Sequence, residues 1–175
     1  MTGHNHGGGE MSSAASPIKN DVKPVAISEK AKETLQPLYK DYLSFKDALV
    51  DDDLAKAIKA AGALKTALEK VNMSVFTGAS HNAWMSYSSD LKNALRHAEH
   101  LKNIDEVRRA FQKVSEGMID LTRAFNPLDQ ILYIQFCPMV DNNQGANWLS
   151  TEESIRNPYF GESMLTCGEN EEVIK

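Results

Sequence analysis

The chain has 175 residues, 42% of them hydrophobic, which is enough for one compact domain with a sizeable core and too few for two. Its formal net charge of −5 argues against a nucleic-acid-binding protein, because such proteins normally carry a basic face. No stretch of about 18 or more apolar residues is present, so we expect no membrane span, and the N-terminus lacks the charged and apolar segments of an export signal.

Residues 1–26 are rich in Gly, Ser, Pro and Asn and show no apolar period. We therefore expect a disordered tail or linker here, followed by one folded domain over residues 27–175. The tail contains His4 and His6, a His-x-His pair that is a candidate auxiliary site for copper or zinc. The alternative is a solvated tail or a cloning remnant, since two histidines without a fixed third ligand hold a metal only weakly.

Four stretches between residues 28 and 126 show the apolar spacing of three and four residues that is typical of helices with one buried face. Stretches of about 20 residues with short connections bury such faces most economically as an antiparallel up-down bundle, so we expect a mainly α four-helix fold. The apolar positions are Leu35, Leu38, Tyr42, Phe45 and Leu49; Leu54, Ile58, Ala61, Leu64, Leu68 and Val71; Trp84, Tyr87, Leu91, Ala94, Ala98 and Leu101; Ile104, Val107, Phe111, Val114, Met118, Leu121 and Phe125.

Local signals place the helix boundaries. Pro37 indicates that the first helix begins near Leu35 or kinks there, because proline removes a backbone donor. The aspartates at 51–53 read as the cap of the second helix in preference to a site for a hard metal ion. Asn103 followed by Glu106 has the pattern of a capping pair at the start of the fourth helix.

The chain after the fourth helix is different in character. Residues 131–136 (ILYIQF) are β-branched and aromatic and predict a strand, and residues 163–166 are the candidate partner strand. We therefore expect a small C-terminal motif that is irregular or two-stranded.

Both cysteines lie in the C-terminal stretch 136–168, each beside a methionine. Cys137 and Met139 are at its start, and Met164 and Cys167 are at its end. If the two ends meet, the four sulfur atoms form a candidate site for Cu(I) or Ag(I), because thiolates and thioethers select soft ions. Zinc would be better served by histidines or further thiolates, and magnesium or calcium by oxygen ligands.

The competing interpretation is a disulfide between Cys137 and Cys167 in a structural or protein-interaction domain without metal. Such a bond would close a loop of about 30 residues and stabilise the fold by roughly 3.5 kcal/mol in the chain-entropy model. A thiol redox protein is a third class. A disulfide has no use for Met139 and Met164 beyond packing, and their placement beside the cysteines favours the metal.

Other side chains have a candidate role near this site. His81 is a candidate auxiliary ligand, and Trp148 could cover a Cu(I) ion with its ring face. Trp148 could instead pin the loop to the helices, with Arg156 binding loop carbonyls or a carboxylate, and Asn157 and Gly161 setting turn geometry.

We expect no enzymatic activity. The sequence contains no Gly-rich phosphate loop, no Gly-x-Ser-x-Gly, no His-Glu-x-x-His and no Cys-x-x-Cys. Cys137 is the only candidate nucleophile, and no histidine is identified as its base.

Several motifs together resemble an uncharacterised domain found alone or at the C-terminus of periplasmic adaptor subunits of copper and silver efflux pumps. They are YLSFKDALVDDD, VRRAFQKVSEGMIDL, FCPM, a Trp-Leu-Ser step, IRNPYFG and MLTCG, and they cover about residues 35–168. The resemblance implies a periplasmic or other extracytoplasmic location, a role in heavy-metal handling, and an efflux adaptor or pump as a partner. The chain lacks the β-barrel and lipoyl-like segments of the adaptors.

Overall fold

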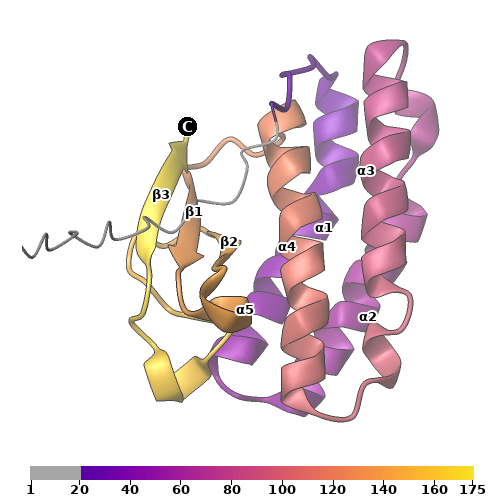
Figure 1. Cartoon of the computed structure of the whole chain (residues 1–175). Coiled ribbons are helices and arrows are strands. Elements are labelled where there is room, and N and C mark those ends of the chain that lie inside the picture. The colour runs from indigo at the N-terminus through magenta and orange to yellow at the C-terminus, as the bar shows by residue number, and fades with distance from the viewer. Residues whose placement is uncertain (1–20) are drawn as a thin grey trace, which may run out of the picture.

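The computed structural model describes residues 21–175, so the histidines at 4 and 6 and the tail before residue 21 lie outside the described residues. The described part is mainly helical, as expected, with a small sheet at its C-terminus (Figure 1). Its helices and strands are α1 (Glu29–Val50), α2 (Leu54–Lys70), α3 (Ala79–Leu95), α4 (Ile104–Phe125), β1 (Leu132–Cys137), α5 (Val140–Asn143), β2 (Ala146–Ser150) and β3 (Glu169–Ile174). The 3-10 turns are η1 (Met73–Val75), η2 (Ala98–His100) and η3 (Gly161–Met164).

The helix starts follow the capping signals in the sequence. Asp53 caps α2 by accepting from Lys56 N–H at 2.9 Å, and Asn103 caps α4 by accepting from Glu106 N–H at 2.9 Å. The predicted caps are therefore confirmed. The first helix begins at Glu29, earlier than Leu35, and continues through Pro37, whose side chain is exposed.

The helices bury one common core. α1 packs on α2, α3 packs on α4, and α1 and α2 both contact α4. Phe111 of α4 is fully buried at the centre of an aromatic cluster, stacked on Tyr42 at 5.4 Å between ring centroids and edge-on to Phe45 at 5.0 Å. Tyr159 from the C-terminal loop packs on the same ring at 5.6 Å, so the loop shares the helical core.

The sheet has three antiparallel strands in the order β2-β1-β3, which corrects the expected two-stranded motif. The predicted first strand is confirmed as β1. The expected partner at residues 163–166 is wrong, because that segment begins in the 3-10 turn η3 and β1 pairs with β2 and β3 instead. The sequence of β3 is Glu-Asn-Glu-Glu-Val-Ile. Glutamate and asparagine are depleted in strands, so residue preferences did not predict this strand.

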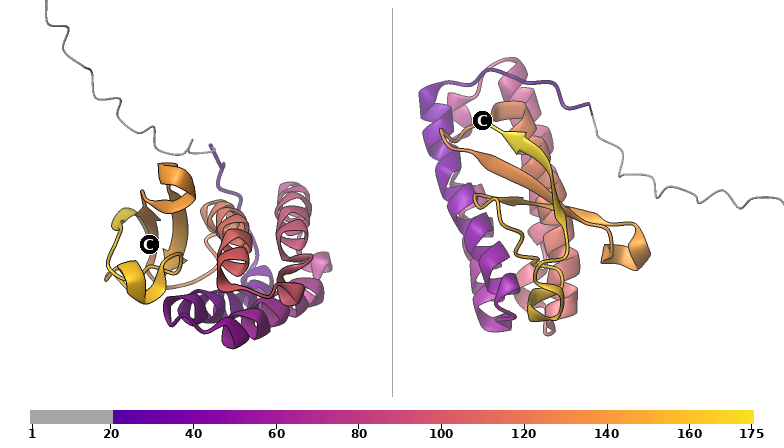
Figure 2. Two further views of the ribbon diagram at one scale, coloured as in Figure 1. Left: turned by 60° about the horizontal axis from the view of Figure 1, so that its bottom comes forward. Right: turned by 90° about the vertical axis from the view of Figure 1, so that its left-hand side faces the viewer.

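The sheet lies between the helices and the C-terminal loop (Figure 2). Directly paired residues of antiparallel strands point to the same face, so Gln135 and its partner Trp148 share a face. The Gln135 amide donates to the Glu152 carbonyl at 3.0 Å and to Asn170 Oδ1 at 2.9 Å, which shows that the loop after β2 covers this face. β2 also packs on α4.

Residues 21–28 run in extended form onto the helical core. Val25 N–H donates to the Ala124 carbonyl at 2.8 Å, and Val22 and Val25 are partly buried against the core. The last residues of the predicted tail therefore contact the domain. Within residues 21–175, no helix is both long and apolar enough to cross a membrane.

Candidate functional site

The two thiols meet on the loop-covered side of the sheet. Cys137 is the last residue of β1 and fully buried, and Cys167 lies just before β3 and is half-buried. Their Sγ atoms are 3.2 Å apart, within hydrogen-bond range for sulfur and well beyond the roughly 2.05 Å of a disulfide. The structure thus brings together two free thiols that are 30 positions apart in the sequence.

The thiol pair shifts the acidity of its more accessible member. The hydrogen bond with Cys137, followed by burial and the proximity of the Cys137 charge, raises the pKa of the Cys167 thiol to about 11. Cys167 is therefore protonated at neutral pH. A metal ion that binds it as a thiolate must displace this proton.

The two methionines lie at the same end of the sheet as the thiols. Met139 follows Cys137 by two residues, in the turn after β1, and its side chain is 48% exposed. Met164 ends η3 and is half-buried, and its carbonyl accepts from Cys167 N–H at 3.0 Å. Each cysteine therefore has a thioether within three residues, one open to solvent and one partly covered.

Asn157 closes the loop that carries Cys167. Its side chain is fully buried, and its Nδ2 donates to the Cys167 carbonyl at 2.7 Å. Its Oδ1 accepts from Tyr159 N–H at 2.8 Å and from Phe160 N–H at 3.3 Å, and its own N–H donates to the Leu165 carbonyl at 2.8 Å. The predicted turn role of Asn157 is confirmed, and it extends to the cysteine.

The closed loop is attached to the turn between α1 and α2. Arg108 of α4 donates to the carbonyls of Leu49 (3.0 Å) and Pro158 (2.9 Å) and to Asp52 Oδ1 (2.5 Å). Asp52 also accepts from Glu162 N–H at 2.9 Å. These bonds lower the pKa of the Asp52 carboxyl, first through Glu162 N–H and then through the Arg108 guanidinium.

The junction of Asp52 and Arg108 was not predicted from the sequence. The three stretches that meet there are the DDD turn, the VRRAF helix and the NPYFG loop, and each belongs to a motif of the family resemblance. That coincidence was the available signal. Gly161 allows the close approach, because its φ is +54° and a Cβ atom there would clash with the Asp52 carboxylate. Arg156 lies 3.4 Å from Asp51, in agreement with its predicted carboxylate partner.

Trp148 is fully buried beside the thiol loop. A Cβ atom at Gly168, the residue after Cys167, would lie 3.1 Å from the Trp148 ring, and Tyr159 packs edge-on to the ring at 5.9 Å. Its Nε1 is buried without a hydrogen-bond partner within residues 21–175. His81 is half-buried in the first turn of α3, which starts at the end of the helices opposite to η3 (Figure 1).

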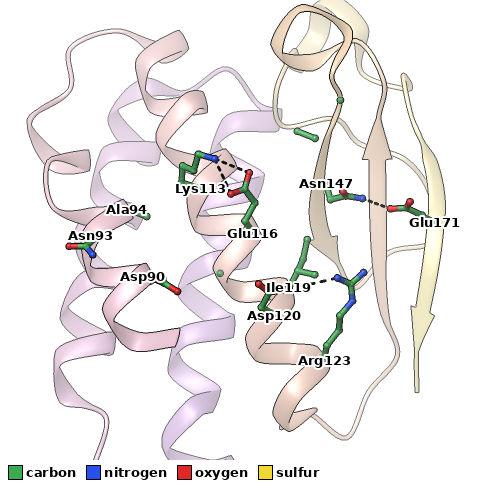
Figure 3. Close-up of a pocket in the computed structure, with 13 residues that line it drawn as sticks. Asp90, Asn93, Ala94, Lys113, Glu116, Ile119, Asp120, Arg123, Asn147 and Glu171 are labelled. Carbon is green, nitrogen blue, oxygen red and sulfur yellow. Dashed lines mark hydrogen bonds and ion pairs between the residues drawn. The ribbon is translucent and has the colours of Figure 1, made fainter. Parts of the chain in front are cut away.

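A polar groove of about 600 Å³ lies between α3, α4 and β2 (Figure 3). Among its charged side chains, Lys113 pairs with Glu116 at 3.0 Å, and Glu171 accepts a hydrogen bond from the Asn147 amide at 2.6 Å. Neither cysteines nor methionines line it. Within the described residues, no group of three or more His, Cys, Asp or Glu side chains is placed to hold a metal ion.

The sequence model of one family, described as "Protein of unknown function (DUF3347)", matches residues 38–130, more than half of the chain. The chain belongs to this family. The DUF3347 match begins in α1 and ends before β1, so it covers the helices and leaves the thiol pair and the sheet outside. Neither the curated proteins nor the solved structures contain a significant match to the chain.

Proposed function

We propose that this DUF3347 protein binds or chaperones a soft metal ion, Cu(I) or Ag(I), with Cys137 and Cys167 as the strong ligands. The observation that carries the proposal is the 3.2 Å distance between the two free sulfur atoms. Soft thiolates in a pair favour a monovalent soft ion, and the thioethers of Met139 and Met164 would complete its ligand shell.

The distance between the thiols suits a site that can open slightly for a metal. With metal–thiolate bonds of about 2.3 Å, as for zinc, two sulfur ligands lie about 3.8 Å apart at a tetrahedral angle and up to about 4.6 Å apart in a linear arrangement. The distance between the two Sγ atoms must therefore increase from the observed 3.2 Å by roughly 0.6 to 1.4 Å when a metal ion binds. Cys167 is the natural mover, because it lies in a loop and is half-buried, whereas Cys137 is fixed in a strand.

The proposed setting is extracytoplasmic and linked to heavy-metal efflux, with an efflux adaptor or pump as the partner. The support for this setting is the motif resemblance described above, since DUF3347 membership by itself assigns no function. We take the protein to be a binding module and not an enzyme. We also take its four long helices as an antiparallel up-down bundle, which agrees with their short connections and their contacts in the order α1–α2–α3–α4.

The second candidate is a structural or interaction domain with a Cys137–Cys167 disulfide. The same 3.2 Å separation favours it, because the sulfur atoms need to approach by only about 1.2 Å to bond. An oxidising compartment would promote that bond.

A competition titration with a Cu(I) chelator on the reduced protein tests the proposal. We expect one Cu(I) per chain, with proton release, and a loss of affinity of at least about tenfold in Cys137→Ser. The double variant Met139→Leu plus Met164→Leu should weaken binding, whereas Met73→Leu plus Met85→Leu is the matched control, since these exposed methionines lie at η1 and in α3. Unchanged Cu(I) affinity in Cys137→Ser would refute the site. If Met139→Leu plus Met164→Leu changes the affinity by less than about twofold, the thioethers are not ligands.

A further inference from the structure

We infer that Asn157 is a positioning residue for the proposed metal site: it holds Cys167 opposite Cys137 so that both thiols can act on one ion. This inference rests on the proposed function. Its structural basis is the 2.7 Å bond from Asn157 Nδ2 to the Cys167 carbonyl.

The bond matters because it holds the Cys167 backbone on the side of the η3 turn, whereas the next fixed point toward the C-terminus is Glu169, which pairs with Phe136 in the sheet. Cys167 lies between η3 and β3, outside regular secondary structure, and its N–H bonds only to the Met164 carbonyl within the same turn. The Asn157 amide ties this turn to a residue ten positions earlier, and that residue is fully buried. A short polar side chain in the domain interior thus sets where the Cys167 backbone lies.

All polar groups of Asn157 take part in this arrangement. Its Oδ1 accepts from two backbone N–H groups, its N–H donates to the Leu165 carbonyl, and its carbonyl accepts from Gly161 N–H at 3.0 Å. The amide orientation is therefore determined, because a flipped amide would point Nδ2 at two donors. The donor side of Asn157 is dedicated to Cys167.

The variant that isolates this role is Asn157→Asp. It keeps the acceptor for Tyr159 and Phe160 but places a carboxylate oxygen where the donor faced the Cys167 carbonyl. The control is Asn170→Asp, at an exposed position in β3. This variant also keeps an acceptor, for Gln135, and loses a donor, here to the Glu153 carbonyl at 2.8 Å and outside the turn of Cys167.

Two measurements report on the pairing of the thiols. The first is the equilibrium with oxidised glutathione, in which the two protein thiols become one disulfide and one oxidised glutathione becomes two reduced molecules; it needs no metal. The second is Cu(I) affinity by chelator competition. We expect Asn157→Asp to lower the equilibrium constant for disulfide formation with glutathione, and also the Cu(I) affinity, by about tenfold or more. Asn170→Asp should change each of these two quantities by less than about twofold.

A positioning role and a merely structural role of Asn157 predict different results on a Cys167→Ser background. Because the positioning role acts through Cys167, we expect Asn157→Asp not to lower the remaining Cu(I) affinity further on this background, although it should still lower the melting temperature. A further loss of affinity there, equal losses in both asparagine variants, or an unchanged glutathione equilibrium in Asn157→Asp would overturn the inference. If Asn157→Asp does not fold, Asn157→Ser takes its place under the same criteria.

The outcomes separate this inference from the proposed function. Wild-type protein that takes up no Cu(I) refutes the proposed function, and the glutathione equilibrium then decides alone whether Asn157 positions the thiols. Wild-type protein that binds Cu(I) while Asn157→Asp leaves that affinity unchanged overturns the role of Asn157 in the metal site.

Discussion

The hydroxyl of Tyr42, in the middle of α1, accepts a hydrogen bond from the backbone N–H of Leu149 in β2 at 3.0 Å, 107 positions away in the sequence. The same hydroxyl lies 2.8 Å from Ser115 Oγ of α4. β2 is an edge strand, and its next outward group, the Asn147 carbonyl, accepts from the Tyr159 hydroxyl at 2.6 Å. Two buried tyrosines therefore satisfy the open edge of the sheet and join it to the helices.

Replacing Tyr42 by phenylalanine removes only one hydroxyl group but should clearly lower the free energy of unfolding. Leu149 N–H and the Ser115 hydroxyl would be left buried without this partner, and such groups cost about 1–3 kcal/mol each in the folded state. We expect the free energy of unfolding to fall by about 2 kcal/mol in urea titrations. Tyr133→Phe is the control, because its hydroxyl has no hydrogen-bond partner within residues 21–175. Equal effects of the two variants would contradict the assigned role.

Arg108 should matter far more than its neighbour Arg109. Arg108 is 11% exposed and donates to two carbonyls and Asp52, whereas Arg109 is exposed. Arg108→Met leaves those acceptors without their donor, so we expect a loss of about 2–3 kcal/mol in the free energy of unfolding. Arg109→Met should change it by less than about 0.5 kcal/mol. A similar, small effect at both positions would show that the junction contributes little.

The contribution of Asp52 should depend on pH in a defined direction. The Glu162 N–H and the Arg108 guanidinium lower the pKa of its carboxyl below the usual 3.8. A carboxyl with a lowered folded-state pKa stabilises the protein above its unfolded pKa, and this stabilisation disappears as the pH falls through the folded value.

Asp52→Asn should therefore be less stable than wild type at pH 7, and the difference should shrink below about pH 4. Chemical denaturation at pH 7, 5, 4 and 3 measures it. Asp90→Asn, at an exposed position in α3, is the comparison variant. A difference between Asp52→Asn and wild type that is constant with pH would argue against the ionic role.

Local patterns predicted the helices and their caps because those depend on residues close in sequence. The caps of Asp53 and Asn103 each act over three positions, and the apolar spacing reports one face of a helix directly. The same apolar spacing also predicted that Tyr42 and Phe111 are buried. It could not predict that the Tyr42 hydroxyl bonds Leu149, because a side chain's distant partner leaves no periodic signal.

The C-terminal region was predicted less well for the same reason. Three of the six residues of β3 are glutamates, which are depleted in strands, so strand preference did not indicate its place beside β1. Arg108 appeared as one charged residue on a helix, and only the fold brings it to Asp52 and the carbonyl of Pro158. The meeting of the two cysteines was a hypothesis from their flanking motifs, and the fold places their sulfur atoms in contact.

The pH dependence of Cys167 alkylation tests the geometry of the thiol pair without any metal. In the reduced wild type, the partner thiol and burial raise the pKa of Cys167 to about 11, so its reactive thiolate should be scarce at pH 8. In Cys137→Ala the hydrogen bond and the neighbouring charge are absent, and the pKa should fall toward the usual value near 9. Thiolate abundance would rise, while each thiolate would be somewhat less nucleophilic, so we expect alkylation at pH 8 to be about tenfold faster.

The raised pKa also has a consequence for stability. A group with a raised folded-state pKa contributes stability below its unfolded pKa, and that contribution is lost as the pH rises from about 9 to about 11. Wild type should lose stability over this range more steeply than Cys137→Ala does. Iodoacetamide kinetics from pH 7 to 11, with the modified residue identified by peptide mass spectrometry, and urea titrations at the same pH values measure both effects. If Cys167 of the reduced wild type already reacts with a midpoint near pH 9, the two thiols do not share a hydrogen bond in solution, and the proposed site would have to assemble on the metal itself.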